Sequence, residues 1–78
     1  MINVVGLLSG LVNIGVNITK SQVETIKWRL SDDAKKYYSD KETNKFYRAV
    51  EKGNTDVIDI VAKEKQKRIE ELKRELDL

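Results

Sequence analysis

The segment MINVVGLLSGLVNIGVNIT (residues 1–19) contains no ionisable side chain, although 36% of the whole chain is charged. Ten of these nineteen residues are Ile, Leu or Val, and most of the others are Gly, Ser or Asn. Burial of so much apolar surface is favourable, and no charge opposes it. The segment therefore predicts that this end of the protein leaves water and that the rest of the chain is organised around it.

The apolar periodicity continues beyond residue 19 into the charged part of the chain. Apolar residues and one threonine recur at steps of three or four, which is the period of an α-helix: Val5, Leu8, Val12, Val16, Thr19, Val23, Ile26 and Leu30. This pattern predicts one helix that reaches to about residue 30, with Gly15 as a weak point inside it.

Small and amide side chains form a second stripe on this predicted helix. Asn3, Gly6, Gly10, Asn13 and Asn17 fall within roughly one quadrant at 100° per residue. Gly6 and Gly10 have the spacing that lets two helix backbones approach closely. A buried amide without a partner costs about 1–3 kcal/mol, so the same stripe on another copy would be a suitable partner. We therefore predict a helix–helix interface at these five residues and a homo-oligomer.

Three destinations remain open for the N-terminal segment: a lipid bilayer, the core of an oligomer, or the core of the chain itself. Nineteen residues reach about 28 Å as a helix, which is close to the roughly 30 Å hydrocarbon thickness of a bilayer. Lys20, Lys27 and Arg29 follow directly and would lie at the membrane surface if the segment were inserted. The alternative is that these three cations form the hydrated face of a helix.

Composition limits the protein to one small helical unit. The chain has 78 residues, no Cys, His or Pro, and 15 basic against 13 acidic side chains. Disulfides and thiolate chemistry are therefore excluded, and a chain of this size buries only about 60% of its unfolded surface. We predict an all-α fold with a long N-terminal helix over residues 1–30, followed over residues 31–78 by a helical connector and a charged C-terminal helical hairpin.

Local signals divide residues 31–78 further. Ser31 with two following acids predicts a short helix, and Ser39 with Glu42 matches a capping box at the start of another. Gly53 is suited to end that helix, and Asn54 or Thr55 to cap the next one. The aromatic residues between positions 28 and 47 are predicted to pack together; a nucleic-acid platform, with lysines between the rings, is the alternative.

The last predicted helix, from Thr55 to about Asp77, has an apolar heptad pattern. This pattern predicts a coiled-coil seam made of Ile58, Ala62, Ile69, Leu72 and Leu76. Lys65 is the one charged residue at a seam position. The surrounding acids and bases alternate at i,i+4 spacing, which is typical of a solvated helix.

No pattern of catalytic residues is present in the sequence. The chain has no His to act as a base, no glycine-rich phosphate loop and no Cys nucleophile. We expect no enzyme activity, no cofactor and no metal site.

The N-terminal run Gly6-Leu7-Leu8-Ser9-Gly10-Leu11-Val12-Asn13, continued by charged helices, resembles small phage-encoded virion proteins, including pilot or ejection proteins. The resemblance covers about the first thirty residues. It implies assembly in a capsid or tube, contact with a membrane and a nearby genome. A long continuous coiled coil is not predicted after residue 30, which departs from the pilot-protein pattern.

The sequence therefore favours a structural or assembly protein that is membrane-associated or part of a virion, with a bilayer or other subunits as partners. Its charged C-terminal part is expected in the cytoplasm or the virion interior. Two alternatives remain. A membrane-active toxin or holin would use Asn13 and Asn17 to line a pore. A soluble helical module would bind a protein or a nucleic acid through the region around residues 28–68.

Overall fold

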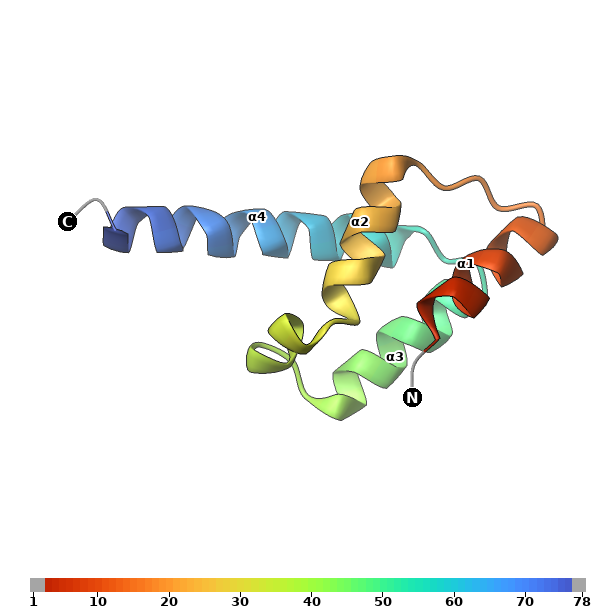
Figure 1. The fold of residues 1–78 in the computed structure, drawn as a ribbon, viewed down its shortest axis with the longest axis horizontal. Coiled ribbons are helices and arrows are strands. Elements are labelled where there is room, and N and C mark those ends of the chain that lie inside the picture. Colours follow the sequence, from red (N-terminus) through yellow and green to blue (C-terminus); the bar gives the residue numbers. More distant parts are fainter. Residues whose placement is uncertain (1–2, 77–78) are drawn as a thin grey trace.

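The computed structural model describes residues 3–76, which form four α-helices and one short 3-10 helix. These are α1 (Val4–Asn13), α2 (Lys20–Arg29), η1 (Asp32–Lys36), α3 (Asp40–Glu51) and α4 (Asp56–Leu76). Figure 1 shows α1 beside α3, α2 crossing α4, and the C-terminal part of α4 extending away from the other helices. The described residues contain no strand, so the all-α prediction is confirmed.

The prediction of one helix through residue 30 is wrong. The chain leaves α1 at Asn13, runs through a non-helical segment and starts α2 at Lys20. Gly15 adopts a positive φ of 80°, and the amides of Gly15 and Val16 donate to the carbonyls of Val12 and Leu11. These two hydrogen bonds form a Schellman motif, which ends a helix. Gly15 is therefore a helix terminator and not a weak point within a helix.

A capping box starts α2. The Thr19 hydroxyl accepts a hydrogen bond from the Gln22 amide at 3.1 Å, and the Gln22 side chain accepts one from the Thr19 amide at 3.0 Å. Such reciprocal bonds satisfy backbone donors that have no partner within the helix. Six residues separate the end of α1 from the start of α2, and the chain reverses direction between the two helices (Figure 1).

The buried face of α1 also differs from the predicted stripe. Leu7 and Leu11 are buried, whereas Val5 and Val12 are 74% and 73% exposed. In one continuous helix, the buried face would have to follow a single apolar stripe along the whole length. Because α1 and α2 are separate helices, each can bury a different face. Ile26 of α2 is fully buried, in the same cluster as the two leucines.

The core lies where the four α-helices meet. It contains seven buried apolar side chains, contributed by every α-helix: Leu7, Leu11, Ile26, Phe46, Val50, Ile58 and Val61. Val16 and Ile18 of the segment between α1 and α2 pack against this cluster. The N-terminal segment is therefore partly covered by the chain's own later helices, which was one of the three destinations considered for it.

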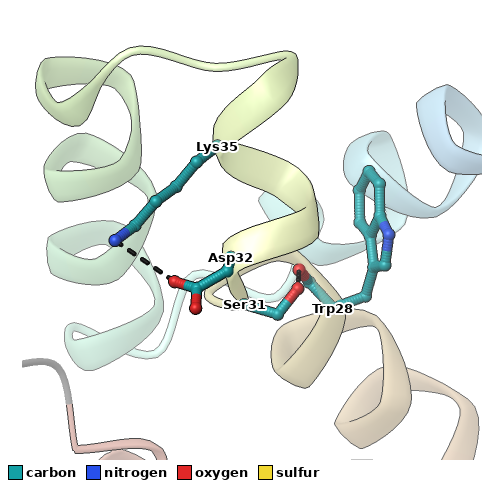
Figure 2. Close-up of polar contacts among 4 residues, drawn as sticks. All are labelled: Trp28, Ser31, Asp32 and Lys35. Atoms are coloured by element: carbon teal, nitrogen blue, oxygen red, sulfur yellow. Dashed lines mark hydrogen bonds and ion pairs between the residues drawn. The ribbon is translucent and has the colours of Figure 1, made fainter.

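The boundaries predicted after residue 30 are largely confirmed. Ser39 and Glu42 form the capping box of α3, and Gly53, with φ of 89°, ends α3 and begins the turn into α4. η1 follows Ser31, but the Ser31 hydroxyl does not cap it. Instead, this hydroxyl donates a hydrogen bond to the Trp28 carbonyl at 2.5 Å, and the Asp32 carboxylate pairs with the Lys35 ammonium at 3.3 Å. Figure 2 shows both contacts.

Candidate interaction surface

The apolar stripe of α4 continues beyond the part of the helix that is covered. Ile58 and Val61 are buried in the core, and Lys65, two turns from Ile58 on the same face, is half-buried. After Lys65, exposure increases toward the C-terminus: Ile69 is 38%, Leu72 is 56% and Leu76 is 76% exposed. We call Ile69, Leu72 and Leu76 the free stripe.

A groove opens where the free stripe meets the body of the protein. It has a volume of about 340 Å³ and lies between α4 and the region where α2 joins η1. Apolar and charged side chains line it together: Trp28, Asp33, Lys36, Tyr37, Lys65, Arg68, Ile69 and Leu72. We call this the Trp28 groove.

The rings around the Trp28 groove hold one another in place. Trp28 and Tyr37 stack with ring centres 6.5 Å apart, and Tyr38 meets Trp28 edge-on at 6.2 Å. Lys65 Nζ lies 5.6 Å from the Trp28 ring centre, and the Arg68 guanidinium lies 4.3 Å from that of Tyr37. Cations at such distances are attracted to aromatic faces. These contacts confirm the predicted packing of Trp28, Tyr37 and Tyr38.

Arg29 lies inside the protein, in contrast to its predicted place at a membrane surface. It is only 3% exposed, its Nη1 donates to Thr43 Oγ1 at 2.8 Å, and its guanidinium lies 3.6 Å from the Tyr38 ring centre and 5.4 Å from that of Phe46. Burial lowers the pKa of Arg29, and the nearby Tyr38 and Glu42 oppose this shift. Arg29 therefore links α2 to α3 beneath the aromatic cluster. Lys20 and Lys27 are exposed, as expected for either interpretation of them.

Tyr38 and Arg68 each carry a buried polar atom without a hydrogen bond. Tyr38 Oη and Arg68 Nε are both shielded from water, and no acceptor or donor within residues 3–76 meets them in bonding geometry. Burial raises the pKa of Tyr38, and the negative charge of Glu64 nearby adds to this shift. Contacts between rings and cations, with Arg29 and Arg68 on the Tyr38 ring, therefore hold these two side chains in place of hydrogen bonds from the two atoms.

The residues of the predicted N-terminal interface are all exposed. Gly6, Gly10 and Asn13 lie on α1, whereas Asn17 lies in the segment that follows it, so the five residues do not share one helix. Asn3 caps α1, since its side-chain oxygen accepts a hydrogen bond from the Gly6 amide at 2.9 Å. Whether this surface pairs with another copy stays a prediction.

The predicted coiled-coil seam is divided by the edge of the body. Ile58 is buried and Ala62 is half-buried, whereas Ile69, Leu72 and Leu76 form the free stripe. The sequence therefore identified the apolar side chains of this surface. It did not identify the Trp28 groove, because the groove depends on where α2 and η1 pack against α4. The spacing of Trp28 from Tyr37 along the chain gives no signal of it.

Comparisons with known proteins found no matching protein family, no matching curated protein and no matching solved structure. Among residues 3–76, no helix is both long and apolar enough to cross a bilayer. The same residues contain no cluster of three or more carboxylate, His or Cys side chains that could hold a metal ion.

Proposed function

We propose that this chain is an assembly protein that acts by helix-to-helix association through the free end of α4. The observation that carries the proposal is that the stripe buried at Ile58 and Val61 continues, uncovered, as Ile69, Leu72 and Leu76. Burying an exposed Leu or Ile side chain contributes about 1.5–3 kcal/mol. A partner that covers the free stripe therefore gains a share of this value at each side chain, in proportion to its exposed fraction of 38% at Ile69, 56% at Leu72 and 76% at Leu76.

The length of α4 supports the same proposal. The helix has 21 residues, but only its first half contributes buried apolar side chains to the core. In proteins, most of the stability of a helix comes from packing of its apolar face against other elements. A partner helix along the free stripe would supply this packing to the exposed half of α4.

The charged residues around the free stripe keep this part of α4 hydrated when no partner is bound. Acids and bases alternate around the free stripe, and Arg68, Glu71 and Glu75 line a shallow pocket next to Leu72 and Tyr37. Association would then combine an apolar centre with a charged rim, as protein interfaces commonly do. A virion or another large assembly, which the N-terminal resemblance implies, is a setting that fits such a module.

The thiol reactivity of a Leu72→Cys variant tests the proposal, because the chain has no other Cys. We expect maleimide to label this thiol slowly in the cells that naturally produce the protein, and quickly in dilute purified protein. A Lys63→Cys variant on an exposed part of α4 is the control and should react quickly in both settings. Equal, fast labelling of Leu72→Cys in both settings would rule out the proposed function.

The second candidate function is residence of α1 at a bilayer surface. Val5 and Val12, two turns apart on one face of α1, are 74% and 73% exposed, and the segment around them has no charged side chain. An apolar helix face of this kind can lie in the interface of a membrane. Flotation with phospholipid vesicles tests this candidate: the parent should float with vesicles and Val12→Asp should not. Recovery of the parent only in the vesicle-free fraction would remove it.

A further inference from the structure

We propose that the partner covering the free stripe is a second copy of this chain, with its α4 antiparallel to the first. This inference rests on the proposed function and names the partner at that surface. In a two-fold dimer the same surface is used by both copies, so it must be complementary to itself. The free stripe and the charges beside it meet this condition in the antiparallel direction only.

Alignment of the two stripes sets the register. If Ile69 of one copy meets Leu72 of the other, the two-fold axis passes α4 between Glu70 and Glu71. The same register places Leu76 of each copy opposite Lys65 of the other. Every residue of the free stripe then meets an apolar residue or the apolar stem of Lys65. The methylene stem of a lysine can cover apolar surface while its ammonium group stays in water.

Charges beside the stripe favour this direction. Arg68 and Glu75 lie seven residues, or about two turns, apart along the same edge of α4. In antiparallel pairs, residues on this edge meet their equivalents across the axis, so Arg68 of each copy meets Glu75 of the other. In a parallel pair Arg68 would instead approach Lys73, and the two positive charges would repel each other.

The Trp28 groove receives the end of the second copy's helix. Because Leu76 reaches the level of Lys65, the last turn of the second α4 lies beside Trp28 and Tyr37, which line the groove. The groove also carries three cations, Lys36, Lys65 and Arg68, against one acid, Asp33. The arriving end of α4 carries the negative end of the helix dipole, which the cations of the groove attract. Its side chains include two acids, Glu71 and Glu75, and two bases, Lys73 and Arg74. The cationic groove is therefore complementary to the dipole of the helix end, whose side-chain charges balance one another.

A charge exchange tests the direction of pairing. Sedimentation equilibrium should give a dimer for the parent, with the dissociation constant on the order of tenfold higher for Arg68→Glu and for Glu75→Arg. The double variant, which restores both pairs, should return toward the parent value. Circular dichroism serves as the fold control for each variant, since Arg68 also contacts Tyr37. A double variant that dimerises more weakly than either single variant would contradict the antiparallel arrangement.

Cross-linking with a short bismaleimide gives an independent test of register. Lys65→Cys and Leu76→Cys proteins are prepared separately and mixed, and we expect mixed 65–76 dimers to exceed 76–76 dimers at least tenfold. Predominant 76–76 products would mean parallel pairing and would overturn the proposal.

Failure of this inference can be separated from failure of the proposed function. If the parent remains a monomer up to millimolar concentration, the second copy is not the partner. If Leu72→Cys is nevertheless masked in the producing cells, the proposed function stands and a different protein covers the stripe. If the thiol is masked in neither setting, both proposals are wrong.

Discussion

A β-carbon added to Gly53 would lie 3.2 Å from Cγ2 of Val16 and 3.5 Å from Cδ1 of Ile14. The segment that links α1 to α2 therefore packs directly on the turn between α3 and α4. Gly53 also has a φ of 89°, which side-chain-bearing residues adopt at a cost of about 1–2 kcal/mol. We expect Gly53→Ala to lower the free energy of unfolding by at least that amount, as measured by urea denaturation. An unchanged midpoint would mean that this contact is absent in solution.

Gly10→Ala should have the opposite effect. A β-carbon at Gly10 meets nothing within 4 Å, and the residue lies inside α1. Alanine in a helix interior is favoured over glycine by about 0.5–1 kcal/mol, so the variant should be more stable than the parent. The sequence-based interface makes a different prediction, namely that bulk at Gly10 weakens self-association. Sedimentation of Gly10→Leu beside the urea midpoint of Gly10→Ala separates the two effects.

Thr19→Ala should destabilise the protein by about 1 kcal/mol, because it removes the side-chain acceptor for the Gln22 amide. Ser39→Ala, at the equivalent position of α3, provides a matched comparison and should lose a similar amount. If residues 14–19 were helical in solution, Thr19 would cap nothing and its replacement would have little effect. Paired urea titrations of the two variants therefore test the break between α1 and α2.

Arg29→Ala and Arg29→Met should differ clearly. Alanine leaves a cavity between Tyr38 and Phe46, and large-to-small changes in a core cost about 2–5 kcal/mol. Methionine refills most of this space without a buried charge, whose desolvation is costly, so we expect it to lose less than half as much. Thermal unfolding followed by circular dichroism measures both. Equal losses would indicate that the charge of Arg29, and not its packing, links α2 to α3.

The α3 capping box should make the protein sensitive to acid. Hydrogen bonds from the Ser39 amide and hydroxyl lower the pKa of Glu42 below its ordinary value of 4.5. The unfolded chain then binds this proton more readily than the folded chain, so the contribution is complete above the unfolded pKa and is lost as pH falls through the folded pKa. Glu42→Gln should remove this part of the acid dependence. Urea midpoints measured from neutral to acidic pH for parent and variant provide the comparison.

The helices after residue 30 could be predicted because their boundaries are encoded locally. Ser39 with Glu42, and Gly53 with the polar residues after it, specify helix ends without reference to the rest of the fold. The break after α1 is also encoded locally, by Gly15 and by the Thr19–Gln22 pair, which has the same capping-box spacing as Ser39 and Glu42. The break was not predicted because apolar residues recur every three or four positions through α1, the linking segment and α2. One long helix would show the same spacing.

The site was only partly predictable. Ile69, Leu72 and Leu76 follow from heptad spacing, but their exposure depends on where the body of the protein ends along α4. The burial of Arg29 could not be anticipated from a basic residue in a charged helix. It follows from the approach of Tyr38 and Phe46, which η1 and α3 bring to α2.

The absence of ionisable side chains from residues 3–19 gives the two ends of the molecule different responses to their surroundings. Attachment of α1 depends on the aliphatic contacts of Leu7 and Leu11, which weaken on cooling and are nearly indifferent to ionic strength. On α4, Lys65 and Arg68 lie over aromatic rings, and added salt weakens the electrostatic attraction between these cations and the rings. Added salt should therefore weaken the cation contacts of Lys65 and Arg68 more than it weakens the packing of α1.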